Sequence, residues 1–289
     1  YYVAGLSSRS IYLGNTTAPG HLLVTNYALT DTQHVQLALP IEKPIAWFGI
    51  KTAIDSPRIY MSEGVNPTIL QGFISDKTVT SQNMHFKFDD GIHLSPSSMA
   101  IRTYDFDLKQ NILAKIRPDS SNEIERYILE KQIDGVFCTD GMLAYDYESA
   151  RLVYLYYYRN QFICLDSNFN IVLKGRTIDT TSIAKIKIAE LPSGRQTMSA
   201  PRVLVNKRCS LSNNLLFVYS GLRANNEEKE NFDHYFVIDV YSIKFGKYLF
   251  SFYLPEYKDR KLRDFQVRDD KLVALYDDYL LTFSLKLDI

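Results

Sequence analysis

LVYLYYY (152–158) is one of six short apolar segments that recur along this chain of 289 residues. The other five are LLVTNY (22–27), IYMSEG (59–64), MAIRTY (99–104), LLFVYSG (215–221) and LVALYDD (272–278). Successive segments start 37, 40, 53, 63 and 57 residues apart, and 39 residues lead from the last start through the C-terminus back to the first. Strand signals that repeat with a period of about 40–50 residues are typical of β-propeller blades. The sequence therefore predicts an all-β fold: a single domain over residues 1–289 that forms a six-bladed β-propeller of four-stranded antiparallel blades.

Each recurring segment is preceded by an alternating segment that we interpret as the inner strand of its blade. These inner strands are predicted at 10–15, 46–51, 85–90, 134–139, 202–207 and 264–269. Hairpins with polar or glycine tips are predicted at 100–116, 162–175 and 235–254. The last blade lacks a fourth segment, and YYVAGL (1–6) has no blade of its own. We therefore expect residues 1–6 to pair with the C-terminal blade and close the ring, because an open ring would expose an unpaired sheet edge.

Two segments depart from the strand pattern. DSSNEIERYILEK (119–131) has serines at its start and apolar residues at helical spacing, so a short amphipathic helix is predicted there. NNEEKENFD (225–233) is polar and acidic, and we interpret it as an exposed extension of a hairpin in the fifth blade.

The charge balance and hydropathy limit the possible partners. The chain has 33 basic and 33 acidic residues, which argues against a nucleic-acid-binding protein, since such proteins carry a basic footprint. No apolar run approaches the roughly 18 residues that a membrane span requires. The sequence begins at Tyr1, so either a cleaved signal or anchor, or simply a shortened chain, is expected.

Cysteine and histidine spacing gives no local metal or nucleophile motif. The residues concerned are Cys138, Cys164, Cys209, His21, His34, His85, His93 and His234. Three cysteines without a CxxC pair predict buried free thiols, with one disulfide plus a free thiol as the alternative. We expect no metal site and no cofactor, since neither HxxxH, a P-loop, GxGxxG nor GxSxG occurs.

One constellation of residues suggests a binding site. Arg9, Trp47, His85, Asp134, Arg202 and Arg263 stand at or just before the predicted inner strands. Inner strands of a propeller run in one direction, so their leading residues would converge at one mouth of the channel. Three guanidinium groups there would favour a carboxylate, a phosphate or an acidic sugar. The alternative is that these are ordinary residues at strand ends.

The blade pattern resembles the six-bladed TolB-like propellers over nearly the whole chain. The opening IYLGNTTAPGHLLVTNYALTDTQHVQLALP (11–40) also resembles a family of uncharacterised bacterial propeller proteins. The resemblance implies an exported protein of the periplasm or cell surface that binds proteins or small ligands. No local motif of the family matches, so none of its binding residues is carried over.

Two functions remain open from the sequence. The first is a non-catalytic, monomeric propeller that binds a protein, a peptide, a glycan or a small anionic ligand on one face. The second is a metal-dependent hydrolase or lactonase with its site at the channel mouth. Propellers host both kinds of function. We favour binding, because the leading residues include three arginines and one aspartate, which suit an anion better than a cation.

Overall fold

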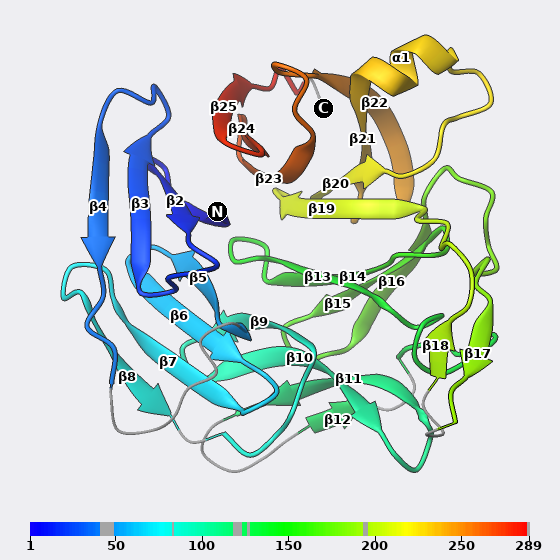
Figure 1. Ribbon diagram of the computed structural model, residues 1–289, viewed down its shortest axis with the longest axis horizontal. Coiled ribbons are helices and arrows are strands. Elements are labelled where there is room, and N and C mark those ends of the chain that lie inside the picture. The colour runs from blue at the N-terminus through cyan, green and yellow to red at the C-terminus, as the bar shows by residue number, and fades with distance from the viewer. Residues whose placement is uncertain (41–48, 83, 118–122, 126–127, 193–195, 288–289) are drawn as a thin grey trace. The chain divides into compact units, whose positions relative to one another are not determined.

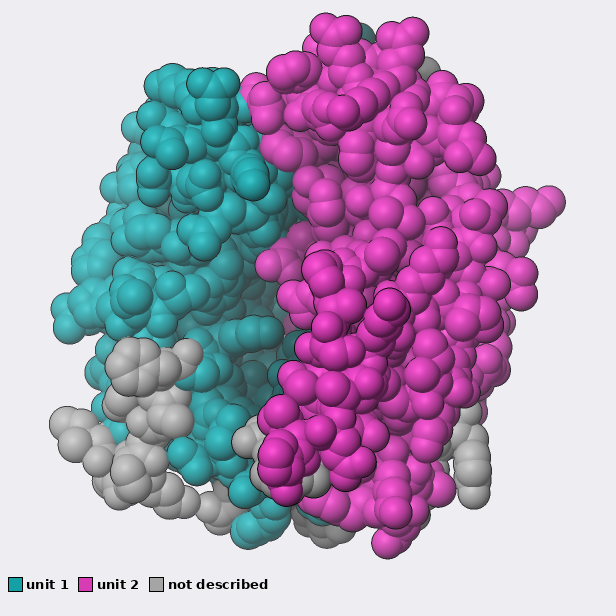
Figure 2. Space-filling model, turned by 45° about the vertical axis from the view of Figure 1, so that its right-hand side comes forward, with its two compact units in different colours: residues 1–103, 114–124, 257–289 teal, residues 104–113, 125–256 magenta. Residues whose placement is uncertain are grey.

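The chain folds as an all-β, six-bladed β-propeller (Figure 1). The computed structural model describes all residues except 41–48, 83, 118–122, 126–127, 193–195 and 288–289. Within the described residues, five antiparallel sheets have four strands and the last has three. The chain forms two compact units (Figure 2): unit 1 comprises residues 1–103, 114–124 and 257–289, and unit 2 comprises residues 104–113 and 125–256.

Unit 1 contains the first two sheets and the last one. The first sheet has strands β1 (Tyr2–Leu6), β2 (Ser10–Gly14), β3 (His21–Asn26) and β4 (Thr32–Gln36). The second has β5 (Lys51–Asp55), β6 (Arg58–Glu63), β7 (Thr68–Phe73) and β8 (Thr78–Gln82). The last has β23 (Leu262–Arg268), β24 (Lys271–Tyr276) and β25 (Tyr279–Ser284). The residues of the third sheet are divided between the units; its strands are β9 (Asp90–Ser95), β10 (Ser98–Asp105), β11 (Gln110–Ile116) and β12 (Glu123–Glu125).

Unit 2 contains two four-stranded sheets and a small hairpin. The fourth sheet has β13 (Gly141–Asp146), β14 (Arg151–Tyr156), β15 (Gln161–Asp166) and β16 (Ile171–Arg176). The hairpin consists of β17 (Ile188–Glu190) and β18 (Gln196–Met198). The fifth sheet has β19 (Asn206–Ser212), β20 (Leu215–Ser220), β21 (Tyr235–Ser242) and β22 (Lys247–Pro255), and helix α1 (Lys229–His234) leads directly into β21.

The central strands carry the core of each unit. In unit 2, Val153 and Leu155 of β14 pack with Phe162, Leu216 and Val218, and all five side chains are fully buried. In unit 1 a corresponding cluster includes Leu22, Ile59, Met61 and Leu70. Strands that are covered on both faces have nearly continuous apolar runs, and this explains why the recurring segments could be identified in the sequence.

The count of six blades is confirmed, but the strand assignment predicted for the first blade is wrong by one strand. Five of the recurring segments form the second strand of their sheets, whereas Leu22 belongs to β3, the third strand. The segment of blade one that matches the others is IYLG (11–14), in β2. The predicted inner strand at 10–15 is therefore a second strand, and the true first strand is β1.

The predicted pairing of residues 1–6 with the C-terminal blade is consequently wrong. β1 pairs antiparallel with β2, from Tyr2 opposite Gly14 to Leu6 opposite Ile11. Val3 and Leu6 of β1 pack with Val273 and Leu275 of the last sheet, and side chains of β23 form hydrogen bonds to the β1 backbone. Asp264 accepts the backbone N–H of Val3 at 3.0 Å, and Gln266 Nε2 donates to the Val3 carbonyl at 2.9 Å.

Replacement of Gln266 by leucine tests this side-chain link. The Val3 carbonyl would lose its only side-chain donor among the described residues, so we expect the free energy of unfolding to fall by about 1 kcal/mol. Urea unfolding of the purified variant measures it. The matched control is Gln33→Leu on the exposed strand β4, which should stay within about 0.5 kcal/mol of the parent. Equal stability of both variants would contradict the link.

The other predicted inner strands differ in accuracy. The strand predicted at 264–269 is confirmed as β23, but those at 85–90, 134–139 and 202–207 begin four to seven residues too early. At 134–139 the Asp134 carboxylate accepts backbone N–H groups, which are then unavailable to a sheet ladder. Residues 46–48 of the segment predicted at 46–51 lie outside the described residues, and the first strand of that sheet, β5, begins only at Lys51.

The structure contains the three predicted hairpins and three free thiols. The hairpins at 100–116, 162–175 and 235–254 are confirmed as β10–β11, β15–β16 and β21–β22. Gly246 adopts φ +66° at the last of these turns. All three cysteines are free thiols; Cys138 and Cys164 are buried as predicted, whereas Cys209 is only half-buried. The helix predicted at 119–131 is wrong where the chain is described, since residues 123–125 form β12.

Candidate functional site

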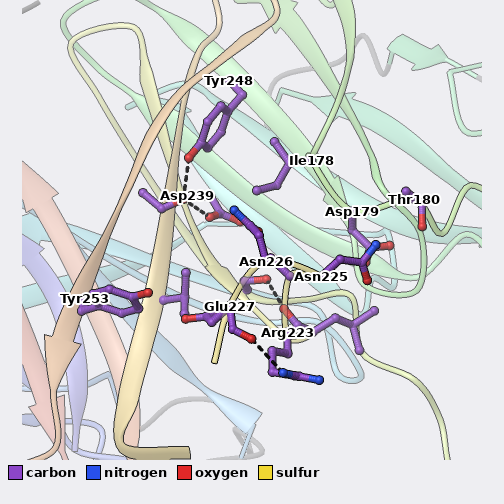
Figure 3. A pocket seen from close by; sticks show the side chains of 15 residues that line it. Ile178, Asp179, Thr180, Arg223, Asn225, Asn226, Glu227, Asp239, Tyr248 and Tyr253 are labelled. Carbon is purple, nitrogen blue, oxygen red and sulfur yellow. Dashed lines mark hydrogen bonds between the residues drawn. The ribbon is translucent and has the colours of Figure 1, made fainter. Parts of the chain in front are cut away.

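A cavity of about 500 Å³ opens in unit 2 between β21, β22 and two connecting segments. The connecting segments are residues 178–180, after β16, and residues 220–227, after β20. Figure 3 shows side chains from all of these elements pointing into the same space. Its polar lining includes Asp179, Arg223, Glu227, Asp239, Tyr248, Ser251 and Tyr253.

The register of β21 and β22 positions one wall of the cavity. Asp239 lies directly opposite Ser251, and Val237 lies opposite Tyr253. Because side chains alternate along a strand, residues 237, 239, 251 and 253 share one face of the sheet. This face provides a carboxylate, a hydroxyl and an aromatic ring side by side.

Asp239 is the centre of a hydrogen-bond network. It is 3% exposed, and Ser251 Oγ donates to its Oδ1 at 2.5 Å. The Tyr241 hydroxyl lies 3.5 Å from Oδ2, and the Tyr248 hydroxyl contacts Ser251 Oγ at 2.9 Å. Burial raises the pKa of the Asp239 carboxyl, and the hydrogen bond from Ser251 opposes the rise. The network connects a buried carboxyl to Tyr248, which is 41% exposed at the cavity edge.

Glu227 provides a second carboxylate, and its Oε1 atom is buried without a hydrogen-bond partner among the described residues. Hydrogen bonding to this carboxylate raises the pKa of the Tyr253 hydroxyl. The guanidinium of Arg223 donates to the Glu227 backbone carbonyl at 2.7 Å. Of the charged side chains that line the cavity, three are carboxylates and one is a cation, so the cavity favours ligands that donate hydrogen bonds.

The site predicted from the sequence falls in both units. In unit 1, His85 lies before β9, and Arg263 lies on β23, 3.7 Å from Asp277. Arg9 is in the turn between β1 and β2. It therefore lies at the end of a first strand rather than at its start, which contradicts the basis on which it was chosen. Trp47 lies outside the described residues.

In unit 2 the two predicted residues make local contacts. The buried Asp134 carboxylate accepts the N–H groups of Val136, Phe137 and Cys138 at 2.7, 2.5 and 3.1 Å. Arg202 Nη1 donates to the Tyr158 hydroxyl at 3.1 Å. A joint site formed by all six residues stays a prediction.

Sequence reasoning missed the cavity, although one signal was present. FVIDVYS (236–242) places an aspartate within an otherwise continuous apolar strand, and a buried carboxylate is unusual enough to mark a candidate site. Glu227 belongs to the segment 225–233, which we interpreted as an exposed extension. That segment does connect β20 to β21, and it contains α1.

Among the described residues, no group of three or more His, Cys, Asp and Glu side chains could hold a metal ion. In the same part of the chain, no helix is long and apolar enough to cross a membrane.

No family model and no curated protein matches the chain, but solved structures resemble it. A member of the DUF4221 family from Bacteroides vulgatus has a TM-score of 0.60 at 12% identity, covering 98% of this chain and 91% of that chain. The tricorn protease has a TM-score of 0.50 at 10% identity, covering 99% of this chain and 33% of that chain. At these identities the likeness shows the fold alone. The resemblance to an uncharacterised bacterial propeller family is confirmed at that level, and the TolB-like assignment stays a prediction.

Proposed function

We propose that this propeller is a non-catalytic binding protein whose cavity around Asp239 and Glu227 takes a glycan or a similar hydroxyl-rich ligand. The observation that supports this most directly is the cavity of about 500 Å³, in which carboxylates, amides, hydroxyls and tyrosines lie together. Its volume falls within the roughly 300–1,000 Å³ that is usual for small-molecule sites.

The chemistry of the wall favours sugar hydroxyls over anions. Carboxylates accept hydrogen bonds from hydroxyls and repel phosphates and carboxylates. The Arg223 guanidinium already donates a hydrogen bond to the Glu227 backbone carbonyl, so fewer of its N–H groups remain for an anionic ligand. The rings of Tyr248 and Tyr253 add apolar faces with polar tips, which suit a ligand that has both C–H and O–H surfaces.

The hydrogen-bond network fixes how a ligand would be held. Ser251 and Tyr241 orient the Asp239 carboxyl, so its position does not have to be established on binding. The unpartnered Oε1 of Glu227 is an acceptor that lacks a donor within the described residues. A ligand hydroxyl would remove the cost of leaving this oxygen buried and unpaired.

Replacement of Glu227 by glutamine tests the site. A hydrogen bond to a charged group contributes about 1.5–3 kcal/mol, so we expect binding to weaken by about 10- to 100-fold. The parent protein is first applied to an array of neutral oligosaccharides, and the best binder is then titrated by calorimetry against both proteins. Glu228→Gln is the matched control, because Glu228 is the exposed neighbour at the N-cap of α1 and does not line the cavity.

Three outcomes would contradict the proposal. They are the absence of any neutral oligosaccharide that binds saturably, equal losses in the Glu227 and Glu228 variants, and release of reducing sugar from a bound glycan. The last would indicate a hydrolase instead. Export to the periplasm or cell surface and a monomeric state belong to the same proposal. The support for export is the resemblance of the sequence to exported TolB-like propellers.

A further inference from the structure

Two histidines of unit 1 meet on adjacent strands of the first sheet. His21 begins β3 and His34 lies on β4, thirteen residues later in the chain. His21 Nδ1 and His34 Nε2 are 2.9 Å apart, and the planes of the two rings differ by 21°. His34 is exposed and His21 is half-buried, so the pair is open to solvent. We propose that His21 and His34 form a chelating site for a divalent transition-metal ion of the Cu²⁺ or Ni²⁺ type.

The separation of the nitrogens fits this chemistry. Metal–imidazole bonds are about 2.0–2.1 Å long, and two of them at a right angle place their nitrogens about 2.9 Å apart. Such angles belong to square-planar and octahedral coordination, which Cu²⁺ and Ni²⁺ prefer. On metal binding, the ring that donates the hydrogen bond between the two histidines would change tautomer, so that its proton moves to the other nitrogen of the same ring and both facing nitrogens present a lone pair. Rotation of the two rings would then direct both lone pairs at one point.

The strand register holds the pair in place and adds a possible third ligand. Gln36 lies opposite His21, and His34 lies opposite Leu23. Residues 21, 23, 34 and 36 therefore share one face of the sheet, and the Gln36 side chain neighbours both rings. HLLVTN (21–26) and TQHVQ (32–36) contain no lysine or arginine that would repel a cation. With two imidazoles as its only strong ligands, the site leaves positions for water or for a ligand atom from outside.

The site is independent of the cavity in unit 2, and the fold does not need the ion. The backbone ladder between β3 and β4 is complete from His21 opposite Gln36 to Thr25 opposite Thr32. Sequence reasoning missed the pair because thirteen residues separate the two histidines, so no local spacing motif such as HxxxH arises.

Calorimetric titration of the tag-free chain with Ni²⁺ tests the proposal. We expect one ion per chain with micromolar affinity, and at least tenfold weaker binding by His34→Asn and by His21→Asn. The control is His234→Asn, because His234 lies in unit 2 beside Glu256, 3.5 Å away, and should not contribute. Ni²⁺ affinity that is unchanged in either single variant would overturn the proposal, as would an equal loss in the His234 variant.

A second measurement uses the parent protein alone and does not depend on how the variants fold. The paramagnetic resonance spectrum of the chain with one equivalent of Cu²⁺ should show hyperfine coupling to two imidazole nitrogens. Coupling to one imidazole, or to none, would overturn the chelate even if Ni²⁺ binds.

Discussion

Replacement of Asp134 by alanine is expected to lower the free energy of unfolding by about 3 kcal/mol or more. The Asp134 carboxylate is 5% exposed and accepts three consecutive backbone N–H groups, those of Val136, Phe137 and Cys138. Alanine would leave these donors without their acceptor, and each buried unpaired donor costs about 1–3 kcal/mol. Chemical unfolding followed by fluorescence would measure the change.

Two variants sharpen this test. Asp134→Asn keeps the oxygen that serves Val136 and Phe137, so its loss should be smaller than that of the alanine variant. Asp233→Ala, in the exposed helix α1, should stay within about 0.5 kcal/mol of the parent. If Asp134→Ala is as stable as the parent, the structural role is wrong. The role as a ligand-binding residue, predicted from the sequence, would then regain support.

Acidification from pH 7 to pH 4 is expected to cost the protein about 3 kcal/mol through His93 alone. His93 is 5% exposed on β9, and its ring stacks on Tyr60 with centroids 4.2 Å apart. Burial lowers its pKa to about 4, whereas an unfolded histidine titrates near about 6.5. At a pH between these two pKa values, His93 binds a proton in the unfolded chain but not in the folded chain. The free energy of unfolding therefore decreases as the pH falls through this window.

His93→Phe isolates this contribution because phenylalanine keeps a ring on Tyr60 and cannot titrate. Urea unfolding of both proteins at several pH values between 4 and 7 would measure it. Half-buried Asp55 and buried Asp239 have raised pKa values and act with the opposite sign, but both remain in the variant. The stability difference between parent and variant should change by about 3 kcal/mol across the window. Parallel curves would contradict the assignment.

The blade count could be predicted because the second strands are covered on both faces. LVYLY (152–156) and LLFVY (215–219) are unbroken runs of apolar and aromatic residues, and burial on both faces requires such a run. The first blade was shifted by one strand because its second and third strands are both apolar. Only the pairing of β1 with β2 distinguishes the two assignments, and that pairing is a tertiary property.

The candidate site was less predictable for a related reason. Asp239 could have been noticed as a charge within an apolar strand, but Glu227 looked like any residue of a solvated loop. Its role depends on how residues 220–227 pass beside β21 and β22, and no local pattern records this. Arg9 was chosen from the shifted first blade, and it therefore lies between β1 and β2 rather than before a first strand.

The side-chain link between β1 and β23 affects the order in which the protein can fold. Val3 finds its partners Asp264 and Gln266 more than 260 positions later, and all of unit 2 is synthesised between them. Contacts of such high sequence separation form late and slowly, since a long loop must close first. All residues of unit 2 have therefore been synthesised before β23, which supplies the side-chain partners of β1. During synthesis the N-terminal sheet is the part most exposed to misassembly and most dependent on protection.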